Sequence, residues 1–181
     1  MGRLAAYLDV LAEWSRRVNL TAARAPVERV RLLVEPVLPA RALPERGTLL
    51  DVGSGNGSPG LVLAHLRDDI EVTLLEPRTR RWAFLREAVR RSAAGRVHVL
   101  RGRHDSYTGP PARTVTIRAL SLSLPELAPL VQPGGLLLVF GGSPRPEGPF
   151  EGLAPGGQGA GDARVFRRLP GDVPRGTPAR G

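Results

Sequence analysis

Apolar residues in the first forty positions recur every three or four residues, the period of one face of an α-helix. The first set is Leu4, Leu8, Leu11, Trp14 and Val18. It predicts an amphipathic helix over residues 3–18. Pro26 opens a second predicted helix. Its apolar face is Val27, Val30 and Val34, and the prolines at its end are Pro36, Pro39 and Pro44. Residues 1–46 are therefore predicted to form a helical extension.

From residue 47 the pattern changes to short apolar runs that alternate with helical stretches. The predicted strands are residues 48–52, 71–77, 97–102, 114–120 and 136–142. Helices are predicted between them, one capped by Ser58 and begun by Pro59, one capped by Thr79, and one around residues 124–131. Because parallel neighbours need crossover connections, this alternation predicts an α/β fold with a doubly wound, mostly parallel sheet covered on both faces. This core is expected to span residues 47–142.

The remaining segment, residues 143–181, has a different composition. Glycine and proline dominate it up to residue 163, which predicts a disordered or loosely looped stretch. One further strand is expected over residues 163–169, followed by a tail.

The charge balance is strongly basic. The 181 residues include 26 basic and 17 acidic side chains, a net charge of +9, and every basic residue is arginine. Such an excess is typical of proteins that bind polyanions, because contacts to phosphates release counterions. A GC-rich genome explains an arginine-only composition equally well, so nucleic acid is one of two interpretations.

The composition also excludes several kinds of site. The chain has no cysteine, so it has no disulfides, thiolate zinc sites or cysteine nucleophile. The N-terminal segment has acidic residues and no long apolar run, which predicts a cytoplasmic protein without a signal peptide or membrane span. No metal site is expected, and the three histidines are interpreted as structural rather than catalytic.

A glycine-rich turn, DVGSGNGSPG at residues 51–60, follows the first predicted strand. Its G-x-G-x-x-G spacing lets the backbone approach a cofactor, and NAD and S-adenosylmethionine both use such turns. Asp51 favours S-adenosylmethionine, because a carboxylate repels a pyrophosphate and attracts the cationic sulfonium and ammonium of the methyl donor. The alternative is that Asp51 caps the following helix or braces the turn.

Other polar residues follow the later strands, where ligands of such sheets bind. Glu76 is placed to accept the ribose hydroxyls of an adenosine cofactor, unless it is only a solvated strand end, and Asp105 is placed to accept from the adenine amino group. The predicted cofactor-binding residues are Asp51, Gly53, Ser54, Gly55, Gly57, Ser58, Glu76, His104, Asp105 and Arg118.

The residue types that the chain lacks exclude several classes of methyl acceptor. Without cysteine it cannot methylate carbon 5 of a pyrimidine, and without lysine it has no lysine-centred base for a ribose hydroxyl. The Asp/Asn-Pro-Pro-aromatic arrangement that holds an exocyclic amino group is also missing. Guanine N7 needs no general base, since its lone pair is already nucleophilic. Catalysis then consists of desolvation and in-line alignment, and no catalytic residue is assigned.

Six stretches between residues 8 and 142 occur in the order of a known family. They are LAEWSRRVNLTA (11–22), LLDVGSGNGSPGLVLA (49–64), VTLLEPRTRRWAFLREAV (72–89), GRHD (102–105), IRALSLSLPEL (117–127) and QPGGLLLVFGG (132–142). Together they resemble the bacterial small-subunit (16S) ribosomal RNA guanine-N7 methyltransferases, also called glucose-inhibited division protein B. The resemblance implies a class I, Rossmann-like S-adenosylmethionine-dependent methyltransferase.

The same resemblance implies roles for individual residues. Gly53 and Ser58 would lie on the donor, the pair His104–Asp105 would clasp the adenine, and Arg118 would reach the donor or the guanine pocket. Candidates for contact with RNA are Arg80, Arg81 and Arg118, although the basic helix face is equally interpretable as solvated. The expected partner is small-subunit ribosomal RNA or the ribosomal particle, bound by a monomer.

The chain departs from the family in several places. The family's His-x-x-Asp-Ser segment is here RLLVEPVL, the usual Lys-Gly after LLLV is Phe140-Gly141-Gly142, and the C-terminal strands are shortened. Two alternatives therefore stay open. One is a small-molecule methyltransferase, and the other is a non-catalytic RNA-binding relic of the fold.

Overall fold

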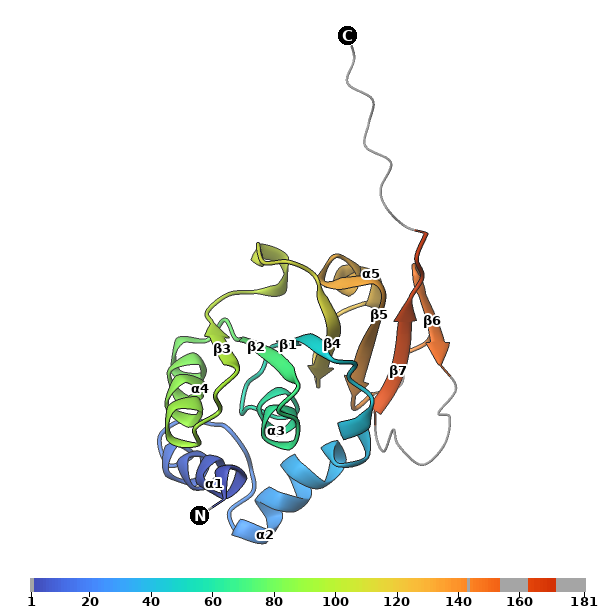
Figure 1. The fold of residues 1–181 in the computed structure, drawn as a ribbon. Helices are drawn as coiled ribbons and strands as arrows, with labels where there is room; N and C mark the ends of the chain where they lie inside the picture. Colours follow the sequence, from blue (N-terminus) through green and yellow to red (C-terminus); the bar gives the residue numbers. More distant parts are fainter. Residues whose placement is uncertain (1, 143, 154–162, 172–181) are drawn as a thin grey trace.

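The computed structural model describes residues 2–142, 144–153 and 163–171, which form one seven-stranded sheet with the order β3-β2-β1-β4-β5-β7-β6 (Figure 1). The strands are β1 Gly47–Val52, β2 Ile70–Leu75, β3 Val97–Leu100, β4 Ala112–Arg118, β5 Val131–Phe140, β6 Phe150–Leu153 and β7 Ala163–Arg168. All pairs among β1 to β5 are parallel, and β7 is antiparallel to both β5 and β6. The predicted mostly parallel, doubly wound α/β fold is confirmed.

The parallel register brings the ends of β1 to β4 to one edge of the sheet. The last residue of β1, Val52, lies opposite Leu75 at the end of β2 and Ile117 near the end of β4. Leu75 in turn pairs with Leu100, the last residue of β3. The segments that leave these four strands therefore start side by side, as expected for a ligand site in this class of sheet.

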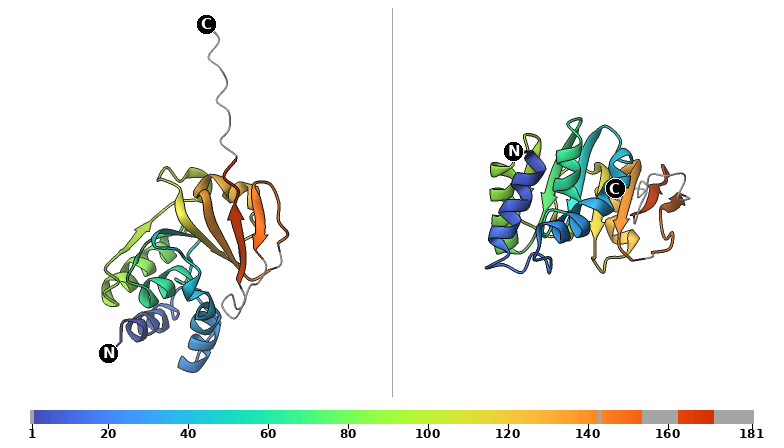
Figure 2. Two further views of the ribbon diagram at one scale, coloured as in Figure 1. Left: turned by 45° about the vertical axis from the view of Figure 1, so that its right-hand side comes forward. Right: turned by 90° about the horizontal axis from the view of Figure 1, so that it is seen from below.

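One face of the sheet is thickly covered. Its helices are α1 Arg3–Trp14, α3 Gly60–Leu66 and α4 Thr79–Arg91, joined by the N-terminal segment of α2 Pro26–Arg29, η1 Val30–Val34, η2 Glu35–Val37 and η3 Pro39–Ala42. Seen from below, these helices lie side by side along the sheet (Figure 2). Tyr7, Leu61 and Phe84 are fully buried in one core cluster with the inward side chains of the strands. Burial of apolar surface thus fixes the N-terminal extension to the core.

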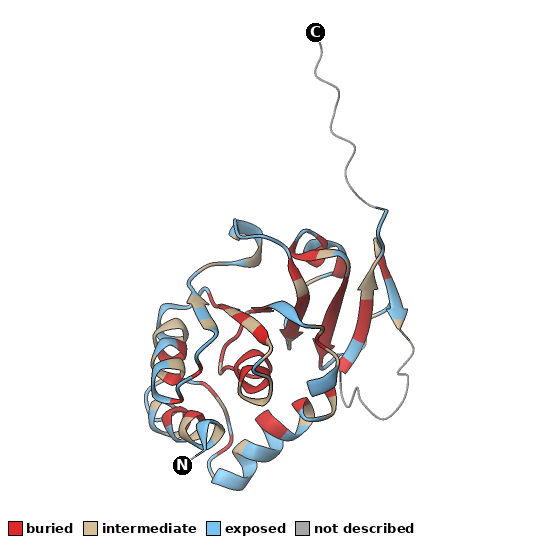
Figure 3. Ribbon diagram, in the orientation of Figure 1, coloured by how far each residue is buried: buried red, intermediate tan, exposed pale blue. Residues whose placement is uncertain are grey.

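The other face has a smaller cover in the part of the chain that the structure describes. The short helices α5 Leu124–Leu127 and η5 Ala128–Leu130 pack there against β4 and β5, and the turn η4 His104–Ser106 follows β3. The central strands are nevertheless buried along most of their length (Figure 3), and their buried side chains divide between two core clusters. The expectation of helices on both faces holds, but the second layer is thin.

The structure corrects the helices predicted for the N-terminal extension. The first ends at Trp14 rather than at residue 18, and the second continues past its prolines as 3₁₀ turns to Ala42. Val27 and Val30, predicted to be on the apolar face, are 63% and 37% exposed. Of the predicted face only Val34 is buried, together with Leu33 in the π-helical turn η1 and Val37 after it.

Two further predictions differ from the structure. Ser58 does not cap α3, because the helix begins at Gly60 after Pro59 and the Ser58 hydroxyl bonds elsewhere. Within the stretch expected to be loosely looped, Phe150–Leu153 forms β6, held by pairing with β7 and by the buried side chain of Phe150. The rest of that stretch (143 and 154–162) and the tail from residue 172 lie outside the described residues. None of the described helices has the length and apolar character needed to cross a membrane.

Candidate functional site

The glycine turn, residues 53–59, joins β1 to α3 at the carboxyl edge of the sheet. Three of its glycines take left-handed backbone conformations: Gly53, Gly55 and Gly57, with φ of +70°, +52° and +92°. Such angles are strained for other residues, so the glycine spacing in the sequence reflects a backbone requirement. The backbone N–H groups of Gly53 and Ser54 donate to the carbonyl oxygen of Leu75 at 2.8 and 3.1 Å, which ties the turn to the end of β2.

Asp51 lies beneath this turn and is 1% exposed. Its Oδ1 accepts a hydrogen bond from the Thr116 hydroxyl of β4 at 2.6 Å. A Cβ atom on Gly60 would lie 2.5 Å from the Cβ of Asp51, so only glycine fits at the start of α3. Burial raises the pKa of the Asp51 carboxyl to about 6, against the lowering effect of the Thr116 hydrogen bond. The geometry is that of a brace between β1, β4 and α3.

Glu76 follows β2 and is 2% exposed. Its Oε2 accepts from the backbone N–H of Gly55 at 2.9 Å, and its Oε1 accepts from the N–H of Arg78 at 2.8 Å. The carboxylate therefore supports the glycine turn directly and is not a solvated strand end. A carboxylate offers about four acceptor positions, so each oxygen can also accept from a ligand hydroxyl.

A cavity of about 180 Å³, here called the donor pocket, opens beside the turn at the ends of β1 to β4. Its lining residues are Val52, Gly53, Pro77, Gly102, Arg103, His104, Leu120, Ser121 and Leu122. Of the predicted site residues, Gly53 and His104 are in this lining. The sequence analysis missed Pro77, Gly102 and Leu120, although each lies within two residues of a strand end or of a predicted site residue.

Leu120 lies directly over the turn. A Cβ atom on Gly53 would be 2.7 Å from the Leu120 Cδ1 atom, so these two residues pack without space for another atom. The Leu120 side chain is 37% exposed and follows Ala119, whose φ of +51° is unusual for a residue other than glycine. Leu120 therefore covers the floor of the donor pocket.

The predicted pair His104–Asp105 separates in the structure. His104 lines the donor pocket, whereas Asp105 is exposed and accepts from the Arg103 guanidinium at 3.0 Å. The hydrogen bond from Arg103 lowers the pKa of the Asp105 carboxyl. Asp105 thus bonds to an exposed arginine that lines the donor pocket, and is not itself in the lining.

Ser58 and Arg118 face the N-terminal extension. The buried Ser58 hydroxyl donates to the carbonyl oxygen of Leu33 at 2.7 Å. Arg118, the last residue of β4, donates from Nη1 to the Ser58 hydroxyl and from Nη2 to the carbonyl oxygen of Leu32, both at 2.7 Å. The Arg118 guanidinium therefore links β4, the glycine turn and η1.

The extension also holds the turn through Asn56. The Tyr7 hydroxyl of α1 donates to the Asn56 carbonyl oxygen at 2.8 Å, and the Asn56 amide Nδ2 donates to the carbonyl oxygen of Leu20 at 3.1 Å. Complete burial raises the pKa of Tyr7. Tyr7 and Asn56 were not among the predicted site residues, because their contacts join segments almost fifty positions apart in the sequence.

The two arginines at the start of α4 have different surroundings. Arg81 donates to the carbonyl oxygen of Asn19 at 3.1 Å, and its Nη1 lies 3.6 Å from where a Cβ atom on Gly55 would be. Arg81 therefore lies next to the glycine turn, whereas Arg80 is exposed at the start of α4.

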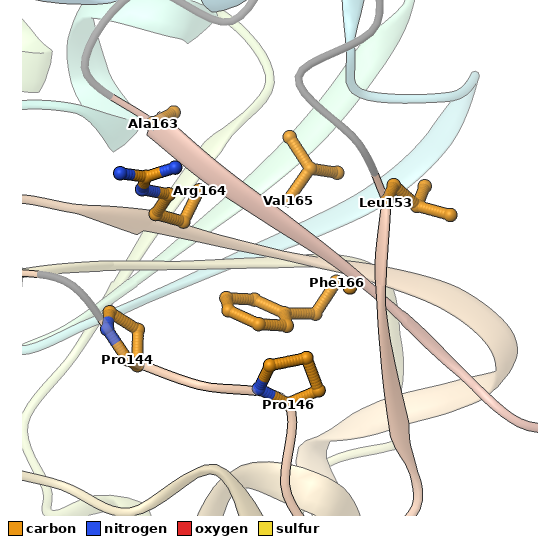
Figure 4. Close-up of a pocket in the computed structure, with 8 residues that line it drawn as sticks. Pro144, Pro146, Leu153, Ala163, Arg164, Val165 and Phe166 are labelled. Atoms are coloured by element: carbon orange, nitrogen blue, oxygen red, sulfur yellow. The ribbon is translucent and has the colours of Figure 1, made fainter.

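A second cavity lies on the C-terminal strands, away from the donor pocket (Figure 4). It is lined by Pro144, Pro146, Gly152, Leu153, Ala163, Arg164, Val165 and Phe166. None of the predicted site residues belongs to this lining, and it borders residues outside the described part of the chain.

The chain is similar in sequence to known methyltransferases. The ribosomal RNA small subunit methyltransferase G of Neisseria meningitidis is 38% identical over 144 residues, covering 77% of this chain and 66% of the relative. The protein of the same name from Xanthomonas campestris is 38% identical over 138 residues, covering 76% and 63%. The chain therefore spans just under two thirds of the length of these relatives.

Among solved structures, a SAM-dependent methyltransferase from Aquifex aeolicus has the same fold. The TM-score is 0.59 at 20% identity, over 80% of this chain and 94% of that chain. This supports the class I methyltransferase fold. Residues 1–147 match the GidB family, described as rRNA small subunit methyltransferase G. That match covers most of the 181 residues and includes every element around the donor pocket, so the chain belongs to the GidB family.

Proposed function

We propose that this protein is an S-adenosylmethionine-dependent methyltransferase that methylates N7 of a guanine in small-subunit ribosomal RNA. The observation that carries the proposal is the donor pocket, built on a glycine turn whose Gly55 amide is held by the buried carboxylate of Glu76, in a chain of the GidB family. The proposal includes the ribosomal RNA or particle as partner, a monomer as the acting form, and the cytoplasm as its location.

The residues around the donor pocket fit the methyl donor. Glu76 offers acceptor positions for the two ribose hydroxyls, and His104 and Pro77 offer ring surfaces at the strand ends for the adenine. S-adenosylmethionine supplies the activated methyl group when bound. The Leu120 side chain packs on Gly53 and can change rotamer, and we expect it to rotate away when the donor enters.

The residues of the chain would then position the methyl donor and the guanine, and would not take part in bond making themselves. Asp51, Ser58 and Arg118 are proposed to keep the glycine turn in place through the contacts described above. Guanine N7 carries its own lone pair, so the protein only needs to exclude water and align the two partners. The proposed division of the chain has three parts: a helical extension over residues 1–46, a donor-binding core over residues 47–142, and a C-terminal segment over residues 143–181.

The test is a methylation assay with small ribosomal subunits that lack the modification. We expect N7-methylguanosine in the ribosomal RNA, and its absence despite measurable donor binding would refute the activity. Methyl transfer to a small molecule without RNA would favour the small-molecule alternative. Salt-sensitive RNA binding without any calorimetric signal for the donor would favour the non-catalytic relic.

Two variants test where the methyl donor binds. Glu76→Gln should weaken donor binding about ten-fold or more, because hydrogen bonds to a charged group contribute more than neutral ones. Asp105→Asn should change donor binding much less, since Asp105 is exposed and bonds to Arg103. Equal losses in calorimetry for the two variants would contradict the position assigned to the donor.

A further inference from the structure

A third cavity, of about 280 Å³, lies at the C-terminal end of α1. It is lined by Glu13, Trp14, Arg16, Arg17 and Val18, and it is here called the Trp14 pocket. The Trp14 ring packs edge-on against Phe84 of α4, with centroids 6.1 Å apart and an interplanar angle of 62°. The indole is thus held firmly on one side and contributes its remaining surface to the pocket.

The charges around this pocket are cationic. Arg16 and Arg17 are exposed, and within the described part of the chain their guanidinium groups make no hydrogen bond or ion pair. The acidic lining residue, Glu13, is paired with Arg91 of α4 at 2.6 Å. An aromatic surface beside two available guanidinium groups matches the two parts of a nucleotide, because bases stack on aromatic rings and phosphates bond to arginine.

The segment that follows the Trp14 pocket contacts α4 and the glycine turn. The chain leaves the pocket at Val18, and the next two carbonyl oxygens, those of Asn19 and Leu20, accept from Arg81 and Asn56. Arg81 thus lies between this segment and the glycine turn, on the path that RNA bound at the pocket would take. Within LAEWSRRVNLTA, Asn19 and Leu20 contact α4 and the turn, whereas Trp14, Arg16 and Arg17 line the pocket.

We propose that the Trp14 pocket binds one nucleotide of the RNA substrate, with the base against Trp14 and the phosphate on Arg16 and Arg17. This inference rests on the proposed function, since it assigns part of the RNA to a surface outside the donor pocket. RNA binding at the Trp14 pocket does not require the methyl donor, so RNA binding and donor binding can be measured separately.

The two tryptophans of the chain provide a direct test. In Trp82→Phe, Trp14 is the remaining tryptophan, and in Trp14→Phe it is Trp82, whose ring already carries the Arg86 guanidinium at 5.0 Å. A short single-stranded RNA should quench the fluorescence of Trp14 and leave that of Trp82 much less changed. The reverse pattern, or equal quenching of both, would overturn the proposal.

Charge variants give the matched control. Arg16→Gln with Arg17→Gln should weaken RNA binding about five-fold or more and reduce its salt dependence. Arg145→Gln with Arg164→Gln removes the same charge from exposed positions on the C-terminal side and should have a much smaller effect. Equal losses would mean that only net charge matters and would refute the pocket.

Failure of this inference differs from failure of the proposed function. If the wild type methylates ribosomal RNA while Trp14 fluorescence does not respond, the pocket is refuted and the function stands. If Trp14 is quenched but no N7-methylguanosine forms, the pocket stands and the function is refuted. A wild type that binds no RNA overturns both.

Discussion

Two glycine turns follow parallel strands at the same edge of the sheet, one after β1 and one after β5. Gly53 and Gly141 have nearly the same left-handed φ, +70° and +77°. A Cβ atom on Gly53 would be 2.7 Å from Leu120, whereas no described atom lies within 4 Å of one on Gly141. The first turn is packed and hydrogen-bonded on every side, and the second is exposed.

This difference separates a turn that its surroundings hold in one shape from a turn that is open on its described sides. Around the first, Glu76, Asn56 and Ser58 join the turn to β2 and to the N-terminal extension. Left-handed glycines alone therefore do not mark a binding site. Polar contacts from distant segments are the stronger indicator, because they hold a backbone shape that the turn itself does not enforce.

The largest expected effect comes from adding a methyl group to each turn. Gly53→Ala introduces both a left-handed alanine and a clash with Leu120, and it should lower donor affinity at least about ten-fold and also lower Tm. Gly141→Ala adds only the backbone strain, roughly 1 kcal/mol. Calorimetry with the donor and thermal unfolding measure both. Similar losses in the two variants would mean that the packing around the first turn has no special role.

The buried carboxylate beneath the first turn predicts a pH dependence. Because the pKa of Asp51 is raised to about 6 in the folded protein, the folded state holds a proton that the unfolded state releases near pH 4. Stability from this group is therefore present at low pH and lost as pH rises from about 4 to about 6, by roughly 2–3 kcal/mol at most.

Asp51→Asn removes this titration and keeps an oxygen that can accept from Thr116. Urea unfolding of wild type and variant at several pH values should show the wild type losing stability relative to the variant across that window. A difference that is constant with pH would contradict a carboxyl that is protonated in the folded protein below about pH 6.

A smaller effect is expected from removing one side-chain amide at the first turn, and Gln132, at the start of β5 and far from both turns, provides the control. Asn56→Ala breaks the bonds to Leu20 and to the N–H of Ser58, and it should cost about 1–2 kcal/mol and weaken donor binding. Gln132→Ala removes one exposed amide bond, to the carbonyl oxygen of Pro111 at 3.0 Å. Its effect on donor binding should be close to zero. A donor affinity unchanged in Asn56→Ala would show that the extension does not support the turn.

Much of the fold could be predicted from the sequence. The alternating apolar runs located β1 to β5 to within a few residues, because a buried parallel strand must be apolar along most of its length. The glycine spacing located the turn, because left-handed φ angles select glycine. β6 was missed, since FEGL has its two apolar residues, Phe150 and Leu153, at its ends without a strand-like alternation, and it becomes a strand only through its pairing with β7.

The candidate site was predicted less completely. Gly53 and His104 lie in the donor pocket, and Glu76, just after β2, accepts a hydrogen bond from the Gly55 amide of the turn. Asp105 is paired with Arg103, and Ser58 and Arg118 face the extension. Their roles in donor binding stay predictions. Local spacing cannot tell which way a side chain points when its partner comes from another segment.

The sequence by itself determined the class of fold, the position of the glycine turn and the family, since each depends on local periodicity or on a continuous motif. The tertiary structure decided how the turn is held. Tyr7, Leu20 and Leu33 reach it from the extension, and Thr116 reaches Asp51 from β4. These contacts join residues that are far apart in the chain, so only the packing of the extension and strands around one core brings them together.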